Sequence, residues 1–346
     1  MARELKLGLN TGYWAGGPPA GVEEAVAEAE RLGFDSIWTA EAYGSDVLTP
    51  LAWWGAKTSR VKLGTAIMQI SARQPAATAM AAMTLDHLSG GRVVLGLGVS
   101  GPQVVEGWYG MSFEKPLART REYIDIVRAI FGREGPVIAP GPHYPLPYPN
   151  GGGFGKPLKS AIHPLRSDIP IYLGAEGPKN VALAAELCEG WLALFFSPAN
   201  EGIYREALEE GFAREGARHS WEDFEVAATV PLIPFDDVEQ AADMLRPMYA
   251  LYFGGMGAKK VNFHANVAIR MGYEGDVRKI QDLYLDGKKE EAAAAVPTKL
   301  IEELALIGPR DKIKDDLERW RESIATTLLV GGDAANVRTA AELVLG

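Results

Sequence analysis

Apolar runs alternate with amphipathic segments along the chain, and this pattern repeats eight times. Each apolar run ends in a turn that carries glycine, serine or an acidic residue, and most runs are followed by an Ala-rich segment with helical periodicity. Gly33, directly after the first helical segment (residues 22–32), is typical of a helix end. Eight strand–helix units predict an α/β fold, a closed parallel TIM (β/α)8 barrel, whose chemistry lies where the strands end.

The same pattern predicts the position of each element. Strands are expected over residues 5–10, 34–39, 61–70, 92–98, 169–173, 191–196, 224–233 and 325–330. Helices are expected over residues 22–32, 48–58, 75–88, 116–131, 178–187, 201–215, 238–253, 311–323 and 334–345.

Two segments break the alternation. Residues 132–168 are dense in proline and glycine and too long for an ordinary connection, so we expect an ordered loop near the barrel mouth or a mobile lid. Residues 257–307 have a helical pattern, clearest at 292–295 and 298–306. We interpret the chain as one barrel domain, residues 1–346, with these two insertions.

Composition and charge indicate which kinds of binding partner this protein is not expected to have. The formal net charge is −10 over 346 residues, and no basic stripe is present, which argues against nucleic acid and anionic membrane surfaces as partners. The single cysteine, Cys188, lies on a helical pattern and is expected to be a buried apolar residue. The five histidines are scattered without ligand spacing, so no metal site is expected. The N-terminus leads directly into a strand and no apolar run reaches membrane-spanning length, so we expect a cytoplasmic protein.

The segment from Gly96 to Gly101 matches the G-x-G-x-x-G pattern of dinucleotide-binding proteins. A Rossmann fold requires a helix that opens at once and an acidic residue about 20 residues further on, at the end of the next strand. Pro102 follows here, and no strand is expected at that distance. In a barrel, glycines at this position instead allow a flat ring to approach the backbone.

The turn from Gly174 to Pro178 has the features of an anion site. A strand ends, a glycine-bearing turn follows, and Pro178 begins a helix whose free N–H groups would face the mouth, with Lys179 beside them. Two interpretations stay open: a phosphate cradle, or glycines that only shape a tight turn.

Other polar and aromatic residues are expected at the same end of the barrel. Gln69 is a polar residue near the end of the third strand, and Glu41, Tyr43 and Asp46 follow the second strand. Trp14, after the first strand, offers a surface for ring stacking. Each has a structural alternative, for example a helix N-cap for Asp46, but their convergence on one face favours a ligand site.

Four motifs, at residues 33–38, 63–66, 90–98 and 169–175, resemble those of the bacterial luciferase-like flavin family. The similarity is greatest to the branch that uses the deazaflavin coenzyme F420. It covers essentially the whole chain in order, and the family fold is an insertion-bearing barrel of the kind predicted above.

The resemblance implies a site for the coenzyme ring and its phosphate. Family members place the ring against a bulge in the third strand that contains a non-prolyl cis peptide, which would be Ala66–Ile67 here. It also implies that Glu41 lies near the pyrimidine edge of the ring. The resulting set of predicted cofactor-binding residues is Glu41, Ala66, Ile67, Gln69, Gly98, Val99, Ser100, Gly101, Gly174, Ala175, Glu176, Gly177 and Pro178.

Departures from the family pattern indicate the reaction. Alcohol and sugar-phosphate dehydrogenases of the family carry Asp-His after the second strand, whereas this chain has Glu41 and Ala42. The resemblance therefore implies hydride transfer from reduced F420 to an unsaturated small organic molecule, with the cofactor carrying the redox chemistry. The candidate proton donors are Glu41, Tyr13, Glu106 and Tyr109.

Two alternative functions stay open. One is an FMN-dependent luciferase-like monooxygenase that uses dioxygen; it usually needs a histidine or cysteine near the flavin, and the mouth segments named above contain neither. The other is a non-catalytic F420-binding protein.

Two expectations concern surfaces. Lys156, Lys159 and His163 in the first insertion either meet the polyglutamate tail of the coenzyme or belong to a solvated loop. A homodimer is expected, with Trp53 and Trp54 as a candidate contact.

Overall fold

A computed structural model describes residues 4–14, 16–257 and 262–346. Its strands are β1 (Lys6–Asn10), β2 (Ser36–Thr39), β3 (Lys62–Thr65), β4 (Met68–Gln69), β5 (Val93–Gly98), β6 (Ile171–Gly174), β7 (Gly190–Ala193), β8 (Glu225–Thr229), β9 (Leu232–Pro234), β10 (Leu306–Gly308) and β11 (Thr327–Val330).

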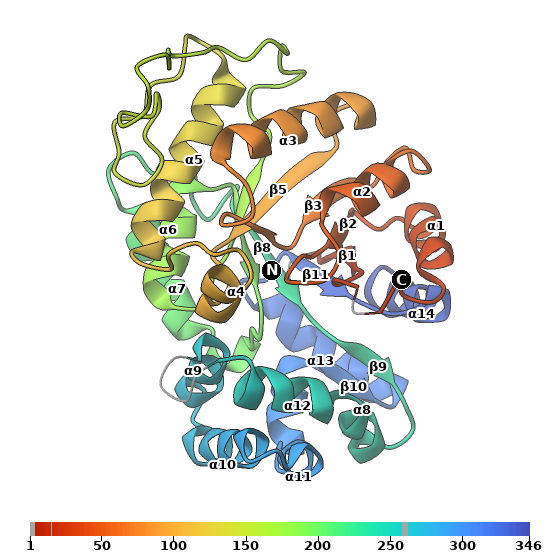
Figure 1. Ribbon diagram of the computed structural model, residues 1–346. Helices are drawn as coiled ribbons and strands as arrows, with labels where there is room; N and C mark the ends of the chain where they lie inside the picture. The colour runs from red at the N-terminus through yellow and green to blue at the C-terminus, as the bar shows by residue number, and fades with distance from the viewer. Residues whose placement is uncertain (1–3, 15, 258–261) are drawn as a thin grey trace.

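The strands form a closed parallel barrel. The order in the main sheet is β3-β2-β1-β11-β8-β7-β6-β5-β4, and pairing of β3 with β5 closes the ring. Because β3 and β4 are two parts of one stave, the barrel has the eight staves predicted from the repeating pattern. Figure 1 shows the helices wrapped around it.

The helices follow the strands around the barrel. They are α1 (Val22–Leu32), α2 (Leu48–Gly55), α3 (Pro75–Ser89), α4 (Pro102–Gly107), α5 (Pro116–Gly132), α6 (Pro178–Leu187), η1 (Pro198–Asn200), α7 (Gly202–Phe212), α8 (Val238–Ala250), η2 (Leu251–Gly255), α9 (Phe263–Arg270), α10 (Glu274–Leu285), α11 (Lys289–Ala294), α12 (Thr298–Leu304), α13 (Arg310–Glu322) and α14 (Ala334–Val344). Within the described ranges, no helix is both long and apolar enough to cross a membrane.

Large aromatic side chains fill the interior of the barrel. Trp38 and Tyr172 lie 5.7 Å apart, between ring centroids, in a buried cluster that includes Leu329. Gly64 makes room for them, since a Cβ at this position would lie 2.2 Å from the Trp38 ring. The barrel is therefore a packed core, and a ligand has to bind above it, at the strand ends.

Two predicted strands are divided in the structure. Residues 61–70 form β3 and β4, separated by Ala66 and Ile67. Residues 224–233 form β8, which stays in the barrel, and β9, which leaves it to pair with β10. The strand β10 was missed because its three residues, Leu306–Gly308, lie at the end of a helical pattern.

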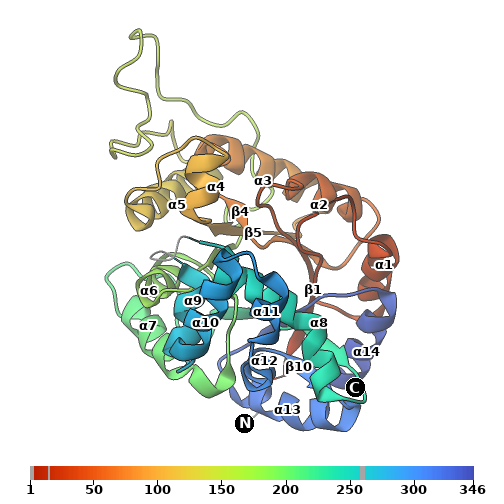
Figure 2. The ribbon, with the colours of Figure 1, turned by 60° about the horizontal axis from the view of Figure 1, so that its bottom comes forward.

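The first insertion ends at the amino ends of the barrel strands, while its middle packs on α5, where the N–H groups of His143 and Tyr144 donate to Glu122. The backbone carbonyl of His163 is 2.7 Å from the ring of His87, at the end of α3. Arg166 pairs with Asp86 and donates to the carbonyl of Val93, where β5 begins. A segment between a helix and the next strand lies at the amino ends of the strands, and Figure 2 shows it as the long yellow-green loop beyond α5.

This position also removes the support for a contact with the coenzyme tail. Lys159 donates to the carbonyl of Glu134, near the end of α5, and not to a group at the mouth. The second insertion lies between α8 and β10, and its helix α9 contacts Glu176, directly after the carboxyl end of β6. Its residues 258–261 are outside the described part of the chain.

Two predictions about buried residues have different outcomes. Cys188 is fully buried, as expected, and burial raises the pKa of its thiol. Of the two tryptophans expected at a dimer contact, Trp54 is only 1% exposed and belongs to the core, while Trp53 is 59% exposed.

Candidate functional site

The bulge in the third stave contains the non-prolyl cis peptide expected between Ala66 and Ile67. Hydrogen bonds hold this bulge against the end of β2. The N–H of Ala66 donates to the carbonyl of Thr39 at 2.7 Å, and the N–H of Glu41 donates to the carbonyl of Ile67 at 3.4 Å.

Two glycines surround the Ile67 side chain. A Cβ on Gly98 would lie 2.8 Å from Ile67 Cγ1, and a Cβ on Gly174 would lie 2.6 Å from Ile67 Cγ2. The two glycines are also partners in the β5–β6 register. The bulge, the end of β5 and the turn that starts at Gly174 therefore form one continuous site, as the coenzyme prediction requires.

Glu41 is buried beside this bulge and fully paired. Its Oε1 accepts from the backbone N–H of Gln69 at 2.9 Å, and Arg73 binds both carboxylate oxygens, at 2.6 and 2.9 Å. The ion pair outweighs burial and raises the pKa of Arg73. Glu41 therefore clamps the bulge, and the structure does not support it as a proton donor. Arg73 was missed because nothing in the local sequence distinguishes it.

Gln69 and Tyr109 meet at the edge of the same bulge. Gln69 Nε2 donates to the carbonyl of Ala42 at 2.8 Å and lies 3.4 Å from the Tyr109 hydroxyl. Gln69 Oε1 is buried without a partner among the described residues, so it can accept from a ligand. Burial, with Glu41 nearby, raises the pKa of Tyr109. Glu106 is not part of this group, since it is exposed and accepts from the N–H of Phe113.

The segment after β5 has a backbone suited to close ligand approach. Ser100 has a φ of 61°, in the left-handed region, and Gly101 is the N-cap of α4. A helix does begin at Pro102, contrary to expectation, because proline fits the first helical position. The helix has only six residues and is followed by α5, not by a strand, so the Rossmann interpretation fails for that reason.

The turn from Gly174 to Pro178 leads into α6 as predicted. Gly177 is its N-cap and no side chain caps the helix. Pro178 has no N–H and the N–H of Asn180 donates to the Gly177 carbonyl, so the N–H of Lys179 is the one that the described residues leave for an anion in this first turn. Ser197 Oγ and Asn180 Oδ1 are buried and have no partner in the described structure. The Ser197 hydroxyl can donate to a ligand. Lys179 is exposed and lies just after the turn.

Two residues of α9 fasten this turn to the second insertion. His264 Nδ1 lies 2.6 Å from Glu176 Oε1, and Arg270 Nη2 donates to the carbonyl of Glu176 at 2.7 Å. The mouth segments named from the sequence contain no histidine, but His264 of the second insertion reaches this turn. Sequence reasoning missed both residues because they are far from the turn along the chain.

Further tyrosines line the mouth. Burial, followed by the influence of Tyr13 and Glu176, raises the pKa of Tyr252 to about 12. Burial and Tyr43 likewise raise the pKa of Tyr13. Both phenols therefore stay protonated at neutral pH. Asp46, a further candidate, caps α2 by accepting from the N–H groups of Leu48 and Thr49, which confirms the structural alternative for it.

The described ranges contain no group of three or more His, Cys, Asp or Glu side chains arranged to hold a metal ion. The site is instead made of glycines, tyrosines, a helix N-terminus and unpaired buried polar atoms.

Comparisons with known proteins agree with this geometry. Residues 7–327 match the family model for luciferase-like monooxygenase. The chain is 56% identical over 347 residues to a Mycobacterium tuberculosis protein provisionally named a coenzyme F420-dependent oxidoreductase, covering 99% of this chain and 100% of that one. It is 29% identical to 5,10-methylenetetrahydromethanopterin reductase of Archaeoglobus fulgidus, covering 90% and 89%. The fold matches the coenzyme F420-dependent tetrahydromethanopterin reductase of Methanopyrus kandleri with a TM-score of 0.82 and 23% identity, covering 99% of both chains.

Proposed function

The chain belongs to the luciferase-like monooxygenase family, and on this premise we propose that it is an F420-dependent oxidoreductase that reduces an unsaturated small organic molecule. The observation that carries the proposal is the continuous site formed by Ile67, Gly98 and Gly174, beside an uncapped helix N-terminus. A flat ring with a phosphate tether fits this combination, and the relative that is 56% identical is named for F420.

The residues that would hold the coenzyme come from four staves. Ala66 and Ile67 would support the ring, and Gln69 Oε1 offers an acceptor for a ring N–H group. The segment 98–101 would border the ring or its side chain. The N–H groups of the turn 174–178, with Ser197, would bind the phosphate.

When bound, reduced F420 supplies the hydride. The protein supplies orientation, exclusion of water and a proton. Tyr109 Oη is our candidate for the proton source, because it lies next to Gln69 at the edge of the bulge and its pKa is raised. Tyr13 is the second candidate, since its pKa is also raised and it lies beside Gly44.

The direction of the reaction follows from Glu41. Oxidation of an alcohol needs a base that can take the hydroxyl proton. Both oxygens of Glu41 are occupied by Arg73 and the N–H of Gln69, and Ala42 stands beside it. This site therefore favours reduction, in which the protein gives a proton to the substrate.

His264 supports a second candidate, an FMN-dependent monooxygenase, because it places an imidazole at the mouth. The test is to titrate the purified protein with F420 and with FMN. We expect F420 to bind at least tenfold more tightly, and reduced F420 to be oxidised by an activated alkene, ketone or imine without dioxygen. Tight binding of FMN alone would refute the proposal, whereas binding of F420 without turnover of any such acceptor would favour a carrier protein.

We further propose one barrel domain and a homodimer. The exposed positions of α3 are Ala77, Met80, Thr84, His87 and Leu88, and none of them is an acidic residue, a lysine or an arginine. An uncharged helical surface of this kind fits a second copy of the chain. The cytoplasmic location stays a prediction.

A further inference from the structure

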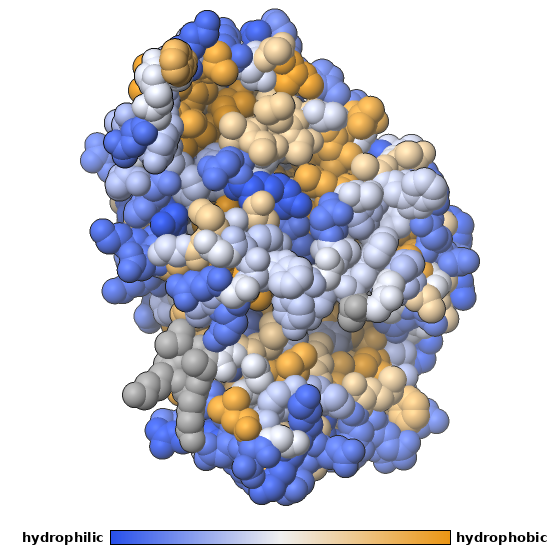
Figure 3. All heavy atoms as spheres, in the orientation of Figure 1, coloured by the Kyte–Doolittle hydropathy of each residue, from blue (hydrophilic) through white to orange (hydrophobic). Residues whose placement is uncertain are grey.

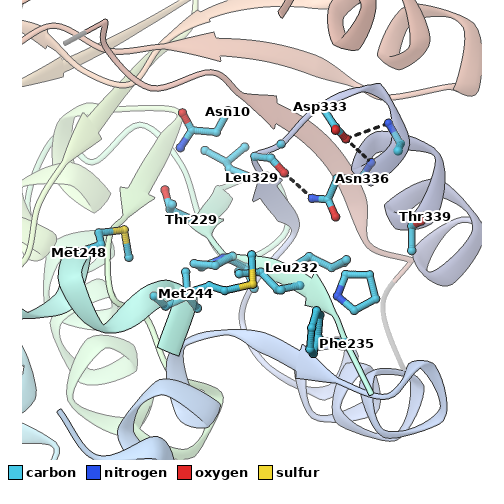
Figure 4. Close-up of a pocket in the computed structure, with 18 residues that line it drawn as sticks. Asn10, Thr229, Leu232, Phe235, Met244, Met248, Leu329, Asp333, Asn336 and Thr339 are labelled. Atoms are coloured by element: carbon cyan, nitrogen blue, oxygen red, sulfur yellow. Dashed lines mark hydrogen bonds between the residues drawn. The ribbon is translucent and has the colours of Figure 1, made fainter. Parts of the chain in front are cut away.

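A cavity of about 660 Å³ opens at the carboxyl ends of β1, β8 and β11, and no residue of it belongs to the predicted coenzyme site. It runs between α8 and α14, and in Figure 4 Met248 lies at its left side and Thr339 at its right side. We call it the α8–α14 groove. Its volume falls within the range of about 300–1,000 Å³ that is typical of small-molecule sites.

The lining of the groove is mostly apolar. Leu232, Phe235, Met244, Met248 and Leu329 supply side chains, and Met residues adapt to ligands of irregular shape. Apolar surface is visible in the hollow below the region of α14 in Figure 3. An apolar ligand would remove this surface from water.

Five polar side chains line the groove, Asn10, Thr229, Asp333, Asn336 and Thr339, and Asp333 and Asn336 are already used. Asp333 accepts from the N–H groups of Ala335 and Asn336, and Asn336 Nδ2 donates to the carbonyl of Gly331. Among the residues that the structure describes, no lysine or arginine lines the groove and Asp333 is its one charged residue. The phosphate and carboxylates of the coenzyme would find no cation here, so the coenzyme tail is not the expected occupant.

The inner end of the groove lies at the carboxyl ends of three barrel strands, at Asn10, Thr229 and Leu329. Leu329 lines the groove and also belongs to the buried cluster against which Ala66 and Ile67 pack. Asn10, at the same end, is paired in register with Trp38 on β2, the strand next to the bulge. A molecule that lies across the mouth can therefore have one end at the ring and the other in the groove.

We propose that the α8–α14 groove binds the hydrocarbon part of the substrate, so that the substrate is an unsaturated compound with an apolar chain or ring system. This inference rests on the proposed function for the identity of the reacting end, but the binding itself does not require turnover. A neutral chain fits because the lining gives mostly apolar contact, and burial of each methylene is worth about a three- to fourfold gain in affinity.

The experiment measures binding of saturated methyl ketones by calorimetry, with and without F420. The probes are 2-pentanone, 2-nonanone and 2-tridecanone, which cannot be reduced at a C=C bond. In the wild-type protein we expect affinity to rise by about 50-fold or more from 2-pentanone to 2-nonanone. Met244→Glu places a charge in the groove and should abolish most of this rise. Met244 is 61% exposed, so the variant should fold.

Leu285→Glu is the matched control. Leu285 is 51% exposed on α10, outside the groove, so this variant should keep the chain-length dependence. Phe235→Ala, which removes apolar surface without adding charge, should reduce the dependence partly.

The outcomes separate the two proposals. No chain-length dependence in the wild type, or the same dependence in Met244→Glu, would overturn the groove proposal whether or not F420 binds. A chain-length dependence that is present in the wild type and lost in Met244→Glu would support the groove proposal even if F420 does not bind. In that case only the proposed function would be refuted. If Met244→Glu instead dissociates a dimer and leaves ketone binding intact, the groove is an interface between copies and the proposal is wrong.

Discussion

Removal of Arg73 tests whether the Glu41 clamp holds the bulge in the third stave. In the native protein the Glu41 side chain is 3% exposed and the Arg73 side chain 21% exposed. Arg73→Met leaves the carboxylate of Glu41 buried with only the N–H of Gln69 as a partner. Loss of one member of a buried ion pair lowers the free energy of unfolding by about 3–5 kcal/mol. Because Arg73 is partly exposed, we expect a loss at the lower end of this range, about 3 kcal/mol.

Glu41→Gln completes the comparison. A glutamine at this position can still accept from the N–H of Gln69 but loses the charge-assisted bonds to Arg73, at a cost of about 1–3 kcal/mol. The double variant Arg73→Met/Glu41→Gln contains no buried unpaired charge. We therefore expect the double variant to be more stable than Arg73→Met alone, by about 1–2 kcal/mol.

Urea denaturation followed by tryptophan fluorescence measures the three stabilities, and titration with F420 measures whether the bulge keeps its binding surface. We expect F420 affinity to fall most in Arg73→Met, because the bulge loses its anchor there. If the two single-variant losses simply add in the double variant, the two side chains act independently and the clamp interpretation is wrong.

Three further outcomes follow from the structure. Gly174→Ala would place a methyl group 2.6 Å from the isoleucine of the bulge, and such overpacking costs about 1–3 kcal/mol. We therefore expect this variant to bind F420 about tenfold more weakly or worse. The control Gly135→Ala meets nothing within 4 Å and should leave the dissociation constant of F420 unchanged. Burial alone would raise the pKa of Glu189, but Arg128 outweighs it and holds this pKa below the ordinary 4.5. The contribution of the Glu189 carboxylate to stability is therefore complete above pH 4.5 and is lost as the pH falls below it. In a plot of denaturation midpoint against pH, Glu189→Gln should therefore flatten the slope on the acid side. An unchanged slope would contradict this. Leu88→Glu introduces a charge on the uncharged side of α3 and should convert a dimer to a monomer in light scattering, and a dimer that persists would place the interface elsewhere.

The sequence determined the elements whose ends depend on local chemistry. The bounds of α1, Val22–Leu32, agree with the prediction because Gly33 takes the left-handed conformation that ends a helix. The bounds of α6, Pro178–Leu187, agree because Pro178 fits the first helical position. The apolar runs also indicated which ends of the strands would meet, and hence that Ile67 and the turn 174–178 would lie in one site.

Only the tertiary structure decided which side chains hold this site together. Arg73 meets Glu41 across 32 residues of chain, and His264 meets Glu176 across 88, in pairs that no local spacing specifies. Such contacts depend on how the staves close and where the second insertion folds back. These contacts show that Glu41, a candidate acid in the sequence, is a clamp, and they bring a histidine to the mouth. The α8–α14 groove likewise forms only in the fold, from segments that are far apart along the chain. The physical reason is that caps and periodicity act over a few residues, while charge pairing and cavities depend on distances that exist only after the barrel has closed.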